Sequence, residues 1–215
     1  DYRDLHSFPT RRSSDLVDVD IPSTTIKRKN MYALVIGNEN YSLSNNPNVE
    51  FAKRDAEIFK EYLIRMFGIP EDNILFGTDL TKGLMDELIK RTKNLVDSSK
   101  ELIVYYAGHG LPDESNQPYL VPVDVSNLTL KESGISHYEL IKELSENKPK
   151  RITMFLDACF SGGSRNGSLL SQTRSIRIKP KNIEISGNTI IFSATSADEY
   201  AQSYKEQSHG LFTYC

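Results

Sequence analysis

The stretch Leu102-Ile-Val-Tyr-Tyr-Ala-Gly-His-Gly110 joins a continuous apolar run to a histidine that stands between two glycines. Continuous apolarity over this length predicts a strand buried on both faces, as in a parallel sheet covered by helices. A second such run, Arg151-Ile-Thr-Met-Phe-Leu-Asp157, leads directly into Ala158-Cys-Phe-Ser-Gly-Gly163. The sequence therefore predicts two buried strands, one ending beside a histidine and the other beside a cysteine.

Further elements alternate along the chain. Short apolar runs predict strands at 31–36, 74–76 and 189–194, with a short extended piece at 119–121. Helical spacing of apolar residues predicts a helix over 49–67 that begins near Pro47, a second from a Thr81 cap to about 98, and a third from Ser136 through Leu144. Strands that alternate with helices indicate an α/β fold, with a mostly parallel central sheet and helices on both faces.

The two motifs predict a catalytic pair. Ligands of open parallel sheets bind beyond the carboxyl ends of the strands, and both His109 and Cys159 follow such ends. A thiol attacks a carbonyl as thiolate, so His109 is the expected base and Cys159 the nucleophile. The backbone amides of Gly110 and Cys159 are the expected oxyanion donors. A lone cysteine here is more often a small buried hydrophobe, and a lone histidine can simply serve a loop, but the two in this order favour a site.

Composition excludes several classes of protein. The 215 residues suit one domain, and 38% hydrophobic with 26% charged residues is typical of a folded globular protein. A net charge of -3 gives no sign of a nucleic-acid partner, and the apolar runs are too short to cross a membrane. With only Cys159 and Cys215, we expect a free thiol in a reducing, cytoplasmic compartment. No Cys/His cluster has metal-ligand spacing, so we expect neither a metal nor a cofactor.

Both ends of the chain differ from the rest. Residues 4–16 have no helical or strand period and look like translated sequencing-adapter sequence, although a basic, Ser-rich disordered arm is the alternative. We therefore expect 1–30 to be a lead-in and 31–215 to be the domain. At 210–215 an apolar, helix-like pattern is just beginning, so we expect the domain to be truncated at its carboxyl end.

The motifs resemble those of a known family. Tyr105-Tyr-Ala-Gly-His-Gly110 resembles the histidine motif of the caspase/metacaspase family of cysteine peptidases, and Asp157-Ala-Cys-Phe-Ser-Gly162 resembles its cysteine motif. His109 and Cys159 stand 50 positions apart, which is about the spacing in caspases. Shorter similarities lie at 33–41, 53–56 and 210–214. The resemblance covers 31–215 and is to members of the bacterial type. It implies a caspase-like three-layer sandwich and a cysteine-type endopeptidase that works through a thioacyl-enzyme.

The resemblance also implies a substrate class, namely protein or peptide chains cut after a basic residue. True caspases carry Gln two positions before the nucleophile and cleave after Asp. This chain has Asp157 there, as in metacaspases, which implies cleavage after Arg or Lys, and Asp55 matches a second acidic pocket residue. A carboxylate at the pocket floor favours a cationic side chain. The alternatives are that Asp157 caps its turn through backbone hydrogen bonds and that Asp55 is an ordinary exposed helical charge.

A polar, basic stretch follows the cysteine motif and suggests self-cleavage. Its candidate sites, which match the expected specificity, are Arg165, Arg174 and Arg177. A solvated basic loop is the equal alternative. The remaining histidines, His137 and His209, are expected to be structural. Calcium activation occurs among relatives, but the sequence has no dedicated calcium loop.

Two other functions compete with the peptidase. A catalytically silent caspase-like adaptor or scaffold would share the fold, but it would need neither His109 nor Cys159. A flavodoxin-like nucleotide or phosphate binder would share the sheet pattern. No Gly-rich phosphate-binding loop follows the first strand, so this third interpretation ranks last.

Overall fold

A five-stranded parallel sheet forms the centre of the computed structural model, which describes residues 18, 20–115, 117–158, 160, 163–164, 167–168, 188–194, 203–204 and 208–214. The strand order is β10-β7-β3-β1-β2, and every neighbouring pair is parallel. The bounds are β1 Met31–Gly37, β2 Ile74–Thr78, β3 Glu101–Ala107, β7 Arg151–Asp157 and β10 Thr189–Ser193. The predicted strands and their parallel arrangement are confirmed.

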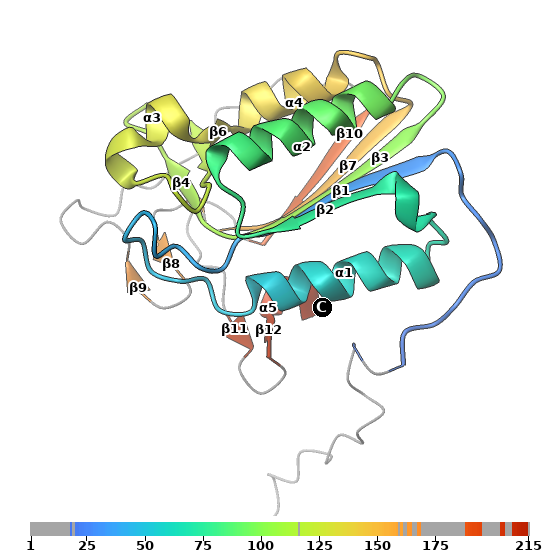
Figure 1. Cartoon of the computed structure of the whole chain (residues 1–215), viewed down its shortest axis with the longest axis horizontal. Coiled ribbons are helices and arrows are strands. Elements are labelled where there is room, and N and C mark those ends of the chain that lie inside the picture. The colour runs from blue at the N-terminus through green and yellow to red at the C-terminus, as the bar shows by residue number, and fades with distance from the viewer. Residues whose placement is uncertain are drawn as a thin grey trace, which may run out of the picture.

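Helices cover both faces of this sheet (Figure 1). Helix α1 (Ala52–Arg65) packs on one face, and α5 (Leu211–Tyr214) lies on the same side. Helices α2 (Lys82–Leu95) and α4 (His137–Ser145) pack on the opposite face. The short helix α3 (Leu130–Ser133) and the 3-10 turns Glu71–Asn73 and Asn127–Thr129 lie in connections. The three-layer α/β architecture expected from the sequence is confirmed.

The side chains of alternate residues in each central strand pack into two separate hydrophobic cores, one on each face of the sheet. In β1, Leu34 and Ile36 belong to the core under α2 and α4, whereas Ala33 and Val35 belong to the core under α1. Strand β3 divides in the same way. Because each strand is buried on both faces, its sequence is continuously apolar rather than alternating. This explains why the stretch that begins at Leu102 shows no period of two.

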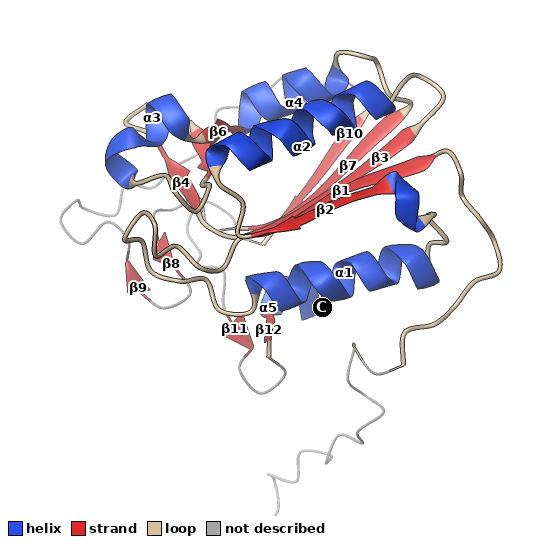
Figure 2. Cartoon of the chain, viewed as in Figure 1, coloured by secondary structure: helices blue, strands red, loops and turns tan. Residues whose placement is uncertain are grey.

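The connections around the main sheet contain small antiparallel sheets (Figure 2). Strand β4 (Gly110–Pro112) pairs with β5 (Pro118–Leu120), which pairs with β6 (Ile135–Ser136). Strand β8 (Gly163–Ser164) pairs with β9 (Gly167–Ser168), and β11 (Ser203–Tyr204) with β12 (His209–Gly210). Strand β4 follows directly from His109, so the β4-β5-β6 sheet builds one wall beyond the carboxyl end of β3.

One predicted helix start and one predicted capping bond differ from the structure, although α2 does begin directly after Thr81. Helix α1 begins at Ala52, not near Pro47, because Phe51 adopts a left-handed backbone conformation with φ 70°. At α2 the Thr81 side chain makes no capping bond; instead the Lys82 N–H donates to Asp124 Oδ1 at 2.8 Å. Helix α4 begins directly after Ser136, as predicted, and the Ser136 Oγ accepts from the Glu139 N–H.

The segment before β1 packs along α1. Ile21 is buried, and the N–H groups of Thr24 and Arg28 each donate at 2.8 Å, to the carbonyls of Arg65 and Gly68 respectively. Gly68 has φ +70°, and a Cβ there would lie 1.9 Å from the Ile26 carbonyl oxygen, so only glycine fits. Residues 4–16 lie outside the described residues.

Candidate active site

The backbone of His109 is fixed by a buried tyrosine pair. Its N–H donates to Tyr41 Oη at 2.9 Å, and its carbonyl accepts from Tyr106 Oη at 2.8 Å. Both rings are buried, and this burial raises the pKa of each phenol. The hydroxyls therefore stay neutral and can donate as well as accept. A Cβ at Gly108 would lie within 2.9 Å of both hydroxyls, so glycine is required beside them.

The His109 ring is oriented by a backbone carbonyl. Its Nε2 lies 2.6 Å from the carbonyl oxygen of Pro47, and the ring packs against Tyr41 with centroids 4.4 Å apart. A carbonyl can only accept, so Nε2 carries the proton, and in the neutral ring Nδ1 holds the lone pair. Sequence reasoning missed this role of Pro47, because a carbonyl acceptor has no side-chain signature.

The histidine and cysteine motifs meet in space. Cys159 itself lies outside the described residues, as do Arg165, Arg174 and Arg177. The neighbours of Cys159 in sequence, Ala158 and Phe160, lie against Gly110. A Cβ added at Gly110 would be 2.7 Å from the Phe160 ring and 3.2 Å from Ala158 Cβ. The Gly108 N–H also donates to the Asp157 carbonyl at 3.3 Å. The predicted convergence of the two strand ends is therefore confirmed for the segments, while the role of Gly110 as an oxyanion donor stays a prediction.

Asp157 is buried and engaged by the carboxyl-terminal helix. Its Oδ2 accepts from the Thr213 hydroxyl at 2.7 Å. Thr213 Oγ1 lies 2.6 Å from the Tyr105 hydroxyl. Because the single Thr213 proton goes to the carboxylate, Tyr105 is the donor to Thr213. A short hydrogen-bonded chain thus links Tyr105 of β3 to the carboxylate at the end of β7.

Asp55 is also fully buried, so the alternative of an exposed helical charge is wrong. Its Oδ1 lies 2.7 Å from His209 Nδ1, and its Oδ2 accepts from the Gly210 N–H at 2.9 Å. His209, expected to be structural, is buried here, and its Nε2 lies 3.6 Å from Asp18 Oδ2. Burial tends to raise the pKa of Asp18, but the Arg54 guanidinium paired with it holds that pKa below its usual value. Sequence reasoning missed this His209 contact, since the two residues are 154 positions apart.

The two predicted acidic residues therefore meet the same short segment of chain. Asp55 contacts residues 209 and 210, and Asp157 contacts residue 213, one helical turn further on. The structure thus brings both predicted pocket carboxylates to residues 209–213, on the α1 side of the sheet.

Comparison with known proteins identifies the family. The family model described as the caspase domain matches residues 30–215. The chain belongs to the caspase family. Its caspase domain is 29% identical over 135 residues to mucosa-associated lymphoid tissue lymphoma translocation protein 1 of Homo sapiens. That match covers 61% of this chain and 15% of the length of the human protein. The resemblance to the caspase family drawn from the histidine and cysteine motifs is confirmed.

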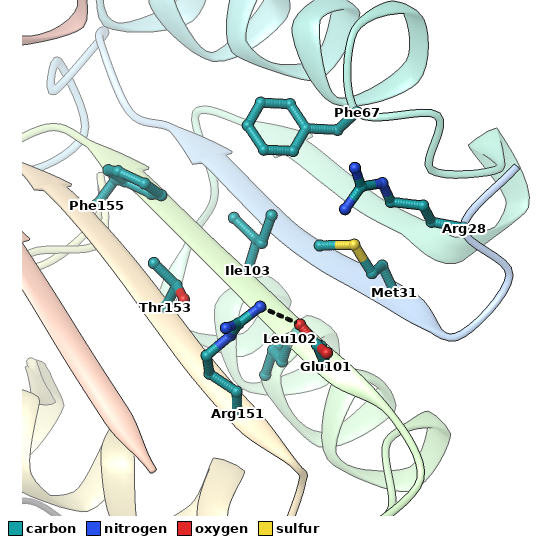
Figure 3. Close-up of a pocket in the computed structure, with 9 residues that line it drawn as sticks. All are labelled: Arg28, Met31, Phe67, Glu101, Leu102, Ile103, Arg151, Thr153 and Phe155. Atoms are coloured by element: carbon teal, nitrogen blue, oxygen red, sulfur yellow. Dashed lines mark hydrogen bonds and ion pairs between the residues drawn. The ribbon is translucent and has the colours of Figure 1, made fainter. Parts of the chain in front are cut away.

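A cavity of about 140 Å³ lies elsewhere in the caspase domain (Figure 3). Its lining includes Met31, Glu101 and Arg151, the first residues of β1, β3 and β7. The figure shows Arg151 paired with Glu101 at this end. His109 follows the opposite, carboxyl ends of the strands, so this cavity is not part of the candidate active site.

In the described part of the caspase domain, no group of three or more His, Cys, Asp or Glu side chains is placed to hold a metal ion. None of the described helices combines the length and apolar character needed to cross a membrane.

Proposed function

We propose that this caspase domain is a cysteine-type endopeptidase in which Cys159 is the nucleophile and His109 the general base. One observation carries the proposal: His109 Nε2 is 2.6 Å from the Pro47 carbonyl, which leaves Nδ1 as the proton acceptor. The ring is thereby oriented by a third group, as a catalytic base requires. A scaffold would have no need of this buried, oriented imidazole.

The chemistry follows in two halves. The Cys159 thiol gives its proton to His109 Nδ1, and the thiolate attacks the scissile carbonyl carbon. The resulting oxyanion accepts hydrogen bonds from the backbone amides of Gly110 and Cys159. Collapse breaks the C–N bond, the leaving amine takes the proton from His109, and a thioacyl-enzyme forms. Water, deprotonated by His109, then releases the carboxylic acid and restores the thiol. These steps use only groups of this chain, so the proposal includes no cofactor.

We further propose cleavage after Arg or Lys in protein or peptide substrates, with Asp157 and Asp55 as the acidic pocket. Two features support this. Both carboxylates are buried, and both contact the same segment at 209–213. A buried carboxylate attracts a cationic side chain far more strongly than an exposed one, and it repels an acidic one.

The test compares fluorogenic peptides that end in Arg, Lys or Asp, with wild type and Cys159→Ala, with and without added calcium. We expect turnover after Arg and Lys that disappears in Cys159→Ala. Turnover after Asp would retain the catalytic pair and overturn the acidic pocket. Equal, background-level rates for the two folded proteins would overturn the peptidase in favour of a scaffold.

A further inference from the structure

Asp55 is held by two N–H donors from one short piece of chain. The His209 ring supplies Nδ1–H to Oδ1 at 2.7 Å, and the backbone of Gly210 supplies N–H to Oδ2 at 2.9 Å. Carboxylate oxygens only accept, so Nδ1 is the protonated nitrogen of this contact. Each oxygen of the carboxylate therefore receives its own N–H donor.

This is the pattern in which a guanidinium binds a carboxylate. Arginine presents two parallel N–H groups, one to each carboxylate oxygen. His209 and Gly210 supply the same pair of donors from within the chain. Asp55 is 0% exposed and His209 1% exposed, so water does not weaken the contact. A substrate arginine that approached Asp55 would have to displace the imidazole.

The outer side of His209 faces a second carboxylate. Its Nε2 lies 3.6 Å from Asp18 Oδ2, and Asp18 is itself paired with Arg54 of α1. The segment also continues to Thr213, whose hydroxyl donates to Asp157. One movement of residues 209–213 would therefore release bonds to both acidic residues.

We propose that His209 and Gly210 occupy Asp55 as an internal stand-in for the guanidinium of a substrate arginine, so that His209 determines how readily the pocket accepts a cation. This inference rests on the proposed function, because it assumes that Asp55 belongs to the substrate pocket. It adds a competing group from the chain itself to that pocket. The unliganded enzyme is thus partly self-inhibited.

The kinetic test uses His209→Ala and His209→Asn, with thermal unfolding as the check on folding. His209→Ala removes one charge-assisted hydrogen bond, so we expect about a tenfold lower KM for an Arg peptide, with kcat within about twofold. His209→Asn is the matched control, because its side-chain amide N–H replaces Nδ1–H, and its KM should stay near wild type. Adding Asp55→Asn to His209→Ala should abolish the gain. Asp18 faces His209 Nε2, and Asp18→Asn leaves no cavity at Asp55. This variant should also lower KM, but by less than His209→Ala does.

A binding measurement separates this inference from the proposed function. Calorimetry with N-acetyl-arginine methylamide, on Cys159→Ala forms of the same variants, measures how tightly the pocket binds an arginine side chain in the absence of catalysis. Tighter binding of this probe by His209→Ala would support the inference that His209 occupies Asp55, whether or not any variant shows turnover. A lack of turnover in every variant would overturn only the proposed peptidase activity. Weaker binding and a higher KM would make His209 a support of the pocket and overturn the inference. Equal affinities and equal KM values in all variants would show that Asp55 is not part of the substrate site, and this would also overturn the inference.

Discussion

At the scale of single residues, His109 is positioned by three hydrogen bonds, made by its backbone N–H, its carbonyl and its ring Nε2. The partner of the ring is the Pro47 carbonyl, which is neutral. A buried acidic partner would add the cost of burying a second ionisable group, whereas a carbonyl orients the imidazole without a charge. The contact therefore sets the tautomer without a charged partner, with the proton on Nε2.

Replacement of Asp157 by Ala should remove cleavage after Arg while leaving the fold intact. The loss of one buried partner of a cation costs about 2–3 kcal/mol or more, which corresponds to a fall of about 100-fold in kcat/KM. Asp86→Asn on the exposed side of α2 is the control and should retain wild-type kinetics. Peptide kinetics on both variants decide the matter. An Arg preference that persists in Asp157→Ala would contradict the pocket assignment.

Gly110→Ala should impair turnover by at least about tenfold with only a modest loss of stability. The new Cβ would stand 2.7 Å from the Phe160 ring and would displace the segment next to the nucleophile. Gly83→Ala in α2 is the control, since nothing lies within 4 Å of its new Cβ. There we expect unchanged turnover and a gain of about 0.5–1 kcal/mol in unfolding free energy. Equal kinetics for the two variants would show that the close approach at Gly110 is irrelevant to catalysis.

At the scale of elements, the helices are held by partners distant in sequence as well as by their own ends. The first N–H of α2 is satisfied by Asp124, 42 positions away, and not by the neighbouring Thr81. Helix α1 is tied to the segment 209–210 through Asp55. These tertiary bonds couple the helices to the loops that surround the candidate site.

Asp124→Ala should lower the unfolding free energy by about 1 kcal/mol, the usual effect of losing a helix cap. Thr81→Ala should change it by only a few tenths of that amount, because the Thr81 side chain makes no capping bond. Urea denaturation of both variants measures the difference. The reverse ranking would show that the local residue is the true cap.

At the scale of the whole molecule, stability should depend on His137. Burial lowers the pKa of His137 from 6.5 to about 4, and its ring stacks on Phe160 with centroids 5.9 Å apart. The unfolded chain thus binds the proton more readily than the folded one between these two values. Stability is complete above about pH 6.5 and falls as pH drops towards 4, by up to about 3 kcal/mol.

The variant His137→Phe tests this dependence, because phenylalanine cannot take up the proton and suits the apolar site. Urea unfolding at pH 7 and pH 4.5 should show a smaller acid loss in the variant than in wild type. The carboxylates titrate equally in both proteins and cancel in the comparison. Identical pH dependence would mean that His137 is accessible to protons in the folded state.

The basic stretch after Cys159 should be cut by the enzyme itself if the proposed specificity holds. Arg165, Arg174 and Arg177 are the expected sites. Mass spectrometry of purified wild type and Cys159→Ala should find these cuts only in wild type. An intact stretch in active enzyme would rule out obligatory processing.

The sequence by itself determined the layers of this protein and the meeting of its two motifs. Continuous apolar runs such as 102–107 identify doubly buried strands, and parallel strands must bring their carboxyl ends to one edge of the sheet. The order of Gly108-His109-Gly110 and of Asp157-Ala-Cys159 then places the histidine and cysteine motifs together. These signals are local, so no tertiary information was needed to read them.

Only the tertiary structure decided how the site is held. The Pro47 carbonyl on His109, the Asp124 cap and the pair of donors on Asp55 join residues 42 to 155 positions apart. Each of the three includes a backbone atom, which every residue has and which therefore leaves no trace in a pattern of side chains. The burial of Asp55 likewise depends on which segment crosses α1, and helical spacing within α1 carries no information about that segment.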